Sequence, residues 1–197
     1  MKINLLKCLA MLTKQWVMSL FILSLLPSVH GCVQPSPRKD LPAWESAFDR
    51  QLPLLGHRNW ILIVDKAFPA QTASGVEVIN TESDMVTVVR AVLAKLAASD
   101  HVTPVVYTDR EFDFLTADLV PQITAVREAY TTLFEGFTLQ SMLHESVFGR
   151  IDEASKMFKT VVLKTECLIP YSSVFIELDC KYWNEKSEQT LREKMNK

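Results

Sequence analysis

The chain has 197 residues, of which 48% are hydrophobic and 22% are charged, a balance typical of a globular protein of one domain. Its formal net charge of −2 creates no strong field for nucleic acid or an anionic membrane, and no basic stripe interleaved with aromatic residues is present. Only 5 glycines occur, and none lies in a GxGxxG or GxxxxGK spacing, which argues against the common nucleotide-binding enzymes.

The first 31 residues have the layout of a secretory signal peptide, with early lysines, an apolar stretch over 16–26 and a small-residue exit. The apolar stretch is short for a membrane-spanning helix, which needs about 20 residues. The segment VHGC, ending at Cys32, is similar to a bacterial lipobox, although His30 is unusual there. We therefore expect an exported protein, either periplasmic or membrane-anchored through a lipidated Cys32. Simple secretion and an uncleaved anchor remain alternatives.

A proline-rich tether is expected over 32–41, before a folded domain over 42–183. Apolar residues spaced by four from Trp44 to Leu52 predict a first helix, and Trp60–Val64 reads as a buried strand between chain breakers. A short strand is expected over 76–79. Ser83-Asp84 then looks like the start of a helix with an apolar stripe.

The second half continues the alternation of strands and helices. The expected elements are a strand over 103–107, helices over roughly 117–134 and 140–158, strands over 160–164 and 174–183, and a charged tail over 184–197. Period-two alternation in the last strand places Val174, Ile176 and Leu178 on one face. The pattern favours a layered α/β domain.

Two cysteines, Cys167 and Cys180, fall within the domain. They could pair in an exported protein, but buried free thiols on strands are the favoured interpretation. Neither has the CxxC spacing of a zinc site, so no metal is expected.

Titratable side chains lie at both ends of the strand Trp60–Val64. Asp65 follows its carboxyl end, where open α/β sheets place ligand sites, and could accept hydrogen bonds from sugar hydroxyls. It could equally cap the following turn. His57 precedes the strand and could transfer protons near neutral pH, or be a surface histidine at the Gly56 turn.

A second polar group surrounds the turn Leu168-Ile169-Pro170. Glu166 and Tyr171 flank this turn, and Ser172 and Ser173 add two hydroxyls. A phenol, hydroxyls and a carboxylate suit a neutral polyol. The alternative is a plain turn with Tyr171 packed on its own strand.

Two blocks of the sequence resemble the ribose pyranase and fucose mutarotase (RbsD/FucU-like) family of sugar mutarotases. The first is GHRNWILIVDKAFPA, where the family has a Gly-His pair, a hydrophobic strand, an Asp and a hydrophobic-Pro pair. The second is KTECLIPYSSVFI, where the family has Thr-Gly-Glu or Ser-Gly-Glu and then Tyr-x-Asn. Between them, FGRIDEASKMF is similar to the family's helix before the penultimate strand. The resemblance covers about residues 42–183.

The resemblance implies a layered αβα domain with a central mixed sheet and a cofactor-independent isomerase of monosaccharides such as fucose or ribose. It implies that His57 is the general acid/base, that Asp65 contacts the sugar, and that Tyr171 and Ser173 bind sugar hydroxyls. Glu166 belongs to the same block.

The chain departs from the family pattern at several positions. Ser173 replaces the Asn, Thr165 replaces the Gly, and one extra residue separates Glu166 from Tyr171. The family's basic pocket residue, a His or Arg, falls near Glu145, with His144 one position earlier.

The two groups of the first block cannot meet along a straight strand, because Trp60–Val64 spans about 16 Å. Either the chain folds His57 back, or neighbouring subunits combine their groups. The family forms rings with sites at subunit contacts, so the resemblance implies a homo-oligomer. The alternative functions are a non-catalytic monosaccharide-binding or scaffold protein of the cell envelope on the same fold, and a structural envelope lipoprotein.

Overall fold

The computed structural model describes residues 41–196, which contain one mixed sheet of six strands in the order β2-β5-β1-β6-β3-β4. The strands are β1 (Trp60–Val64), β2 (Val76–Asn80), β3 (Val102–Asp109), β4 (Thr138–Met142), β5 (Thr160–Lys164) and β6 (Val174–Cys180). The helices are α1 (Ala43–Gln51), α2 (Met85–Ala98), α3 (Ile123–Leu133), α4 (His144–Ser155) and α5 (Glu185–Met195), with 3₁₀ turns η1 (Leu52–Leu54) and η2 (Arg110–Phe114). β6 is antiparallel to β1 and β3, and the other neighbours are parallel.

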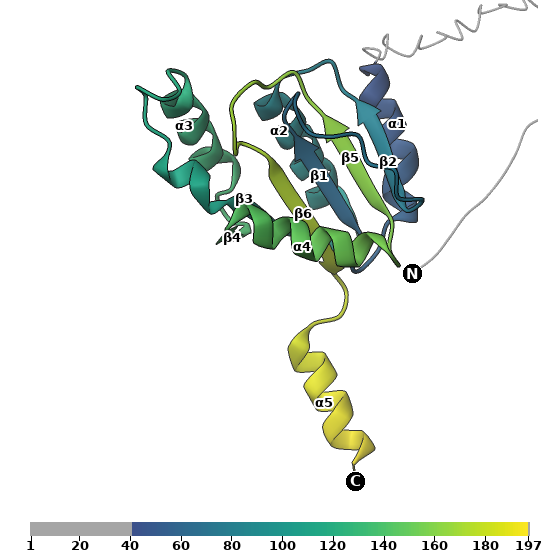
Figure 1. Cartoon of the computed structure of the whole chain (residues 1–197). Coiled ribbons are helices and arrows are strands. Elements are labelled where there is room, and N and C mark those ends of the chain that lie inside the picture. Colours follow the sequence, from purple (N-terminus) through teal and green to yellow (C-terminus); the bar gives the residue numbers. More distant parts are fainter. Residues whose placement is uncertain (1–40, 197) are drawn as a thin grey trace, which may run out of the picture. The chain divides into compact units, whose positions relative to one another are not determined.

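Helices cover both faces of the sheet, as Figure 1 shows: α4 crosses in front of it and α2 lies behind it. The expected layered αβα domain with a central mixed sheet is therefore confirmed.

The central strand β1 is buried along its whole length because both faces are covered. Ile61 and Ile63 pack into the core shared with α1, α2 and α3. The alternate residues Trp60, Leu62 and Val64 pack into a second core beneath α4. An uninterrupted apolar run is what a strand between two layers requires, and each fully buried side chain contributes about 1.5–3 kcal/mol.

Helix α2 begins where the sequence indicated. The Asp84 side chain accepts a hydrogen bond from the backbone N–H of Thr87 at 2.9 Å, which satisfies one of the unpaired donors of the first turn. The expected apolar stripe is buried, at Met85, Val88, Val89, Val92, Leu93 and Leu96. In β6, Val174, Ile176 and Leu178 share one core and Phe175 faces the other, so the predicted alternation is confirmed.

Several predicted boundaries are wrong. The expected helix over 140–158 begins only at His144, because Thr138–Met142 forms the edge strand β4. The helix expected from residue 117 begins at Ile123. The last strand ends at Cys180 instead of 183. Strand β4 is mostly exposed, so it lacks the apolar alternation that marks a half-buried strand.

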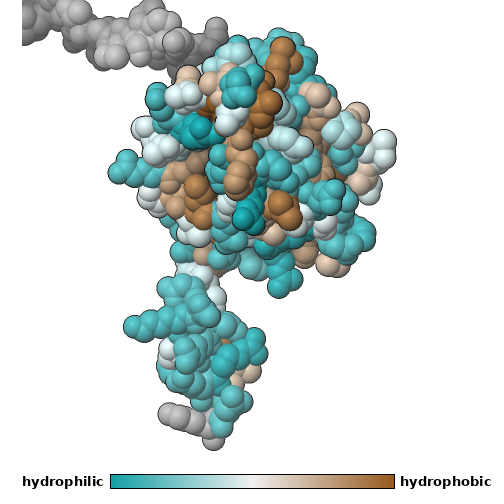
Figure 2. Space-filling model, turned by 60° about the vertical axis from the view of Figure 1, so that its left-hand side comes forward, coloured by the Kyte–Doolittle hydropathy of each residue, from teal (hydrophilic) through white to brown (hydrophobic). Residues whose placement is uncertain are grey.

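The charged tail contains helix α5, which buries none of its residues. Its side chains are almost entirely hydrophilic, as the lowest part of Figure 2 shows in teal. Among the described helices, none has the length and hydropathy that crossing a bilayer requires. The expected signal peptide (1–31), Cys32 and nearly all of the tether (32–41) lie outside the described residues.

Candidate functional site

Because β6 is antiparallel to its neighbours, its amino end lies beside the carboxyl ends of β1, β3 and β5. Asp65 follows β1, Asp109 ends β3, and Ser173 immediately precedes β6. His144 joins them because β4, parallel to β3, ends close to the start of α4. Residues far apart in the sequence thus meet at the carboxyl ends of these strands.

A pocket of about 430 Å³ lies at these strand ends. Its lining is Asp65, Ala67, Phe68, Pro69, His144, Phe148, Cys167, Leu168, Ile169, Pro170 and Tyr171. Three of the residues expected to contact sugar, Asp65, His144 and Tyr171, are therefore brought together. Aromatic and aliphatic side chains make up most of the remaining wall, which is the usual composition of a small-molecule site.

Asp65 caps the turn that follows β1, which is one of the two roles that the sequence left open, and its contact with a sugar stays a prediction. One carboxylate oxygen accepts a hydrogen bond from the backbone N–H of Ala67 at 2.8 Å, which caps the turn after β1. The other oxygen accepts a hydrogen bond from the Ser173 hydroxyl at 3.3 Å. Ser173 is itself buried, so its hydroxyl orients Asp65 and does not line the pocket.

His144 is held on three sides. Its Nδ1 lies 2.9 Å from Asp109 Oδ2, and its backbone N–H donates to the Glu111 carboxylate at 3.1 and 3.2 Å. The ring of Phe148, one helical turn later, lies 4.6 Å from the imidazole centroid, and the Tyr171 ring meets it edge-on at 5.3 Å. Of the two candidates for a basic pocket residue, His144 lines the pocket and Glu145 does not.

Asp109 is the site residue that the sequence analysis missed. Its side chain is 0% exposed, although it carries a carboxyl group. Burial raises its pKa from 3.8 to about 6. His144 opposes that rise, whereas Glu111 and Asp65 add to it. The signal was present in the sequence, because Asp109 directly follows an apolar strand as Asp65 does. The strand was predicted to end at residue 107, two positions too early.

Replacing this carboxylate by an amide is expected to stabilise the protein in a pH-dependent way. Because the folded state holds the Asp109 proton to a higher pH than the unfolded state, the ionising group lowers stability as pH rises from about 4 to about 6. Across this window the free energy of unfolding of Asp109→Asn should therefore rise relative to that of the wild type. The difference should reach about 1–3 kcal/mol near pH 7. Urea denaturation at several pH values measures the difference. A difference that does not vary with pH would contradict the assignment, and exposed Asp113→Asn is the control.

The loop before β6 positions the Tyr171 ring. Tyr171 has a φ of 56°, a left-handed conformation that costs a non-glycine residue about 1–2 kcal/mol. Its neighbour Ser172 anchors the loop: the hydroxyl donates to the Ile169 carbonyl at 2.7 Å, and the Ser172 carbonyl accepts from the buried Tyr130 hydroxyl at 2.6 Å.

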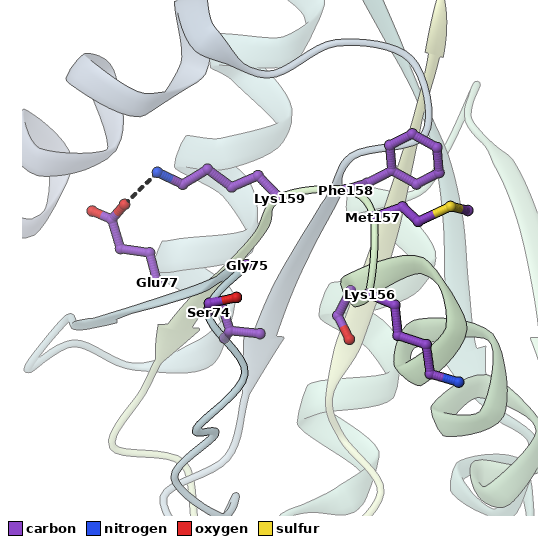
Figure 3. A pocket seen from close by; sticks show the side chains of 9 residues that line it. Ser74, Gly75, Glu77, Lys156, Met157, Phe158 and Lys159 are labelled. Atoms are coloured by element: carbon purple, nitrogen blue, oxygen red, sulfur yellow. Dashed lines mark ion pairs between the residues drawn. The ribbon is translucent and has the colours of Figure 1, made fainter.

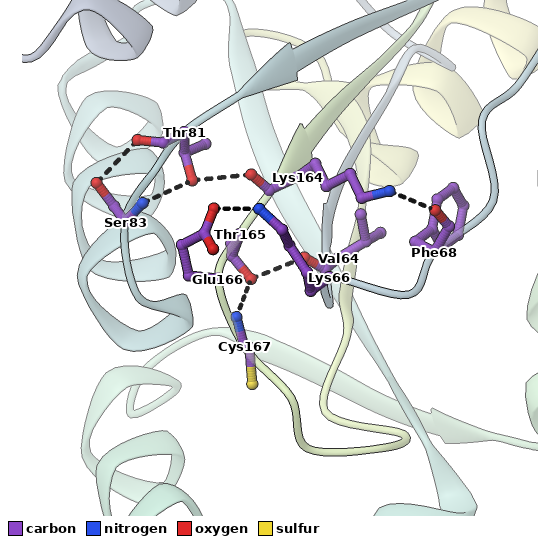
Figure 4. A network of polar contacts seen from close by, with 9 residues as sticks. All are labelled: Val64, Lys66, Phe68, Thr81, Ser83, Lys164, Thr165, Glu166 and Cys167. Atoms are coloured by element: carbon purple, nitrogen blue, oxygen red, sulfur yellow. Dashed lines mark hydrogen bonds and ion pairs between the residues drawn. The ribbon is translucent and has the colours of Figure 1, made fainter.

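A polar network joins this loop to the strand ends, as Figure 4 shows. The Thr165 hydroxyl donates to the Val64 carbonyl at 2.8 Å, so the residue that replaces the family's Gly binds β1. Lys164 Nζ donates to the Phe68 carbonyl at 2.8 Å, which holds the loop after β1 against β5. These contacts fix the backbone on both sides of the pocket.

Three other expected site residues lie outside the pocket. Glu166 forms an ion pair with Lys66 and faces a neighbouring depression on the other side of the Cys167–Ile169 segment. Glu145 is exposed in the first turn of α4 and does not line the pocket. His57 lies before the amino end of β1, whereas the pocket lies at the carboxyl end of this strand.

The idea that the chain folds His57 back toward Asp65 is therefore wrong. The His57 Nδ1 lies 3.0 Å from the Asp179 carboxylate, at the far end of β6, and Arg58 Nε donates to its Nε2 at 3.1 Å. The imidazole is about half exposed, at 54%. The remaining possibility from the sequence is a site that combines groups of two subunits.

A second depression, of about 470 Å³, lies at the amino edge of the sheet (Figure 3). Lys159 crosses it to form an ion pair with Glu77 at 2.7 Å, and Gly75 lies where a Cβ would come within 2.8 Å of the Ser155 carbonyl oxygen. These contacts join β2, β5 and α4, so we interpret this depression as structural. In residues 41–196 no cluster of three or more metal-ligating side chains occurs. Cys167 and Cys180 are both free thiols.

Comparisons with known proteins found similarity only in three dimensions: no family model and no curated protein matches the chain. RbsD of Bacillus subtilis, solved with D-ribose, is 15% identical with a TM-score of 0.48, over 72% of this chain and 98% of that one. The fucose mutarotase of Streptococcus pneumoniae, solved with L-fucose, is 18% identical with a TM-score of 0.49, over the same shares. FucU of Bifidobacterium longum is 14% identical with a TM-score of 0.46, over 68% of this chain and 94% of that one. This similarity is one of fold alone. With TM-scores below 0.5, it carries no residue role, substrate or activity over to this chain.

Proposed function

We propose that this chain is a cofactor-independent isomerase that interconverts the anomeric or ring forms of a free monosaccharide. The observation that carries the proposal is the meeting of Asp65, His144 and Tyr171 on one pocket whose other walls are apolar. A carboxylate, an imidazole and a phenol can bind hydroxyl groups, while the rings of Phe68 and Phe148 can pack against the C–H face of a sugar.

The reaction needs two proton-transferring groups and no further chemistry. One group removes the proton of the anomeric hydroxyl, while the other protonates the ring oxygen as its bond to the anomeric carbon breaks. The carbonyl of the open chain rotates. Closure reverses both transfers: the hydroxyl that attacks the carbonyl returns its proton to the acid, and the base returns its proton to the carbonyl oxygen. The resemblance of the first sequence block gives His57 one of these roles.

We place His57 in the site of a second copy, since it and the pocket of its own chain lie at opposite ends of β1. The protein is then a homo-oligomer with sites at subunit contacts. For this role Arg58 must release the Nε2 of His57, which it contacts in the single chain.

Nuclear magnetic resonance of sugar exchange tests the proposed function. Saturation of one anomer of fucose, ribose or a related sugar should transfer to the other faster when protein is present. Tyr171→Phe, which keeps the ring and removes the hydroxyl, should weaken binding by about 10-fold, with exposed Tyr182→Phe as the matched control. No acceleration with any monosaccharide would refute the isomerase.

The alternative is a protein that binds a monosaccharide at the same pocket without converting it. Two observations favour it: both ring nitrogens of His57 have partners within the chain, and the Ser173 hydroxyl is directed to Asp65. Calorimetric binding of a sugar without accelerated exchange would select this alternative. Absence of binding would exclude both functions.

Export remains part of the proposal, as a periplasmic protein or an anchored lipoprotein. Incorporation of labelled palmitate that is lost in Cys32→Ser would establish the anchor.

A further inference from the structure

Asp109 places a buried carboxylate directly behind the imidazole that lines the pocket. Its Oδ2 lies 2.9 Å from His144 Nδ1, whereas its Oδ1 is buried with no hydrogen-bond partner among the described residues. A buried polar atom without a partner costs about 1–3 kcal/mol. The fold therefore retains a buried carboxylate of which only one oxygen has a hydrogen-bond partner. This pattern is more typical of a functional site than of a structural one.

The surroundings of Asp109 make its charge still harder to keep. The groups that face it are His144 at the start of α4, Glu111 from η2 and Asp65 from the loop after β1. Two of these three groups are acidic, and only His144 favours the ionised form. The imidazole thus stabilises the ionised form of Asp109, and the two acidic neighbours destabilise it.

This contact determines which nitrogen of His144 carries the proton. An ionised carboxylate only accepts hydrogen bonds, so a neutral His144 must carry its proton on Nδ1. The lone pair then lies on Nε2, and the ring, 39% exposed, lines the pocket. Phe148 and Tyr171 restrict the rotation of the ring.

We propose that Asp109 is a positioning residue that fixes His144 as the second proton-transferring group of the pocket. This inference rests on the proposed function, in which His57 of another copy is the first group. Nε2 of His144 takes the proton of the anomeric hydroxyl. The O–H electrons form the carbonyl as the ring C–O bond breaks, and protonated His57 supplies the proton of the ring oxygen. Ring closure reverses both transfers.

The first experiment reads the tautomer of His144 without any sugar. In ¹⁵N-correlated spectra of the full chain, neutral His144 should carry its proton on Nδ1, with His144→Gln identifying the signal. In Asp109→Asn the amide can donate to Nδ1, so the form with the proton on Nε2 should become populated. Asp113→Asn, an exposed change in the 3₁₀ turn η2 that follows β3, should leave the tautomer unchanged. A wild-type protein already protonated on Nε2, or an Asp109→Asn spectrum like that of the wild type, would overturn the positioning role.

The second experiment measures sugar exchange by the same variants. Asp109→Asn should lower kcat by about 10²-fold and leave KM within a few-fold, because the carboxylate acts on proton transfer and not on the sugar. Wild-type activity should fall as pH falls through about 6, where Asp109 takes up its proton, and this step should shrink in Asp109→Asn. A merely structural role would change the height of the profile without changing its shape.

The two proposals fail separately. If the wild-type protein exchanges no sugar, the proposed function is refuted and the tautomer spectra alone decide whether Asp109 positions His144. If the wild type is active and Asp109→Asn retains its kcat and pH profile, the inference is refuted while the isomerase stands.

Discussion

Two inactive variants are expected to restore each other's activity when their subunits are mixed. His57→Ala should lower sugar exchange by about 10²–10⁴-fold, because it removes a proton-transferring group. Asp65→Asn should lower it by about 10²-fold, because it removes the charge of a carboxylate that binds the sugar. Because His57 and the pocket lie at opposite ends of β1, about 16 Å apart, an active site must take them from different copies. In a ring that is refolded from equal amounts of both variants, about a quarter of the contacts pair an intact pocket with an intact His57. The mixture should therefore recover about a quarter of the wild-type rate.

A matched mixture distinguishes recovery from mere dilution of the defects. Asp65→Asn combined with His144→Gln places both defects on the pocket side, so no pairing creates an intact site. That mixture should remain inactive. No recovery in either mixture, or a monomer in size exclusion that has full activity, would show that one chain completes its own site.

Truncation of Phe175 should give the largest loss of stability. This side chain is fully buried in the core beneath α4, and its ring meets Phe148 edge-on at 5.8 Å. Phe175→Ala should lower the free energy of unfolding by about 3–5 kcal/mol, since it removes a large buried ring and leaves a cavity. Phe175→Leu should lose about 1–1.5 kcal/mol. Urea denaturation measures both.

The same truncation should also weaken sugar binding at the pocket. Phe148 stacks on Phe68 at 5.6 Å and contacts His144, so a cavity beneath it loosens the apolar wall. Sugar binding should weaken in Phe175→Ala at temperatures at which the protein remains folded. Phe114→Ala, at a residue that is 69% exposed, is the control and should change stability by less than about 0.5 kcal/mol. A loss below about 1 kcal/mol in Phe175→Ala would show that this core is loosely packed.

Elements with an apolar signature could be predicted from the sequence. β1 and α2 were found because continuous or periodic burial determines their composition. The strand β4 was missed, because its residues are exposed at the sheet edge and pair through the backbone alone. Backbone pairing leaves little trace in side-chain types.

The site was predictable to the extent that strand ends determine it. Asp65 and Tyr171 flank strands that the sequence showed, and their meeting follows from the order of the sheet. Glu166 and Glu145 were wrongly expected beside the pocket, because neighbours in a turn or a helix point in different directions. Asp109 was missed because the strand before it was predicted to end at residue 107, and its contact with His144, 35 residues away, could not be recognised without the fold.

The left-handed backbone of Tyr171 has an evolutionary consequence. Glycine would relax this conformation, and asparagine would remove the buried charge at Asp109, so each replacement would make the protein more robust while disabling it. Selection for folding and selection for chemistry therefore oppose each other at these two positions. A lineage that no longer needs the chemistry should accumulate glycine at the first and asparagine at the second before the rest of the fold diverges.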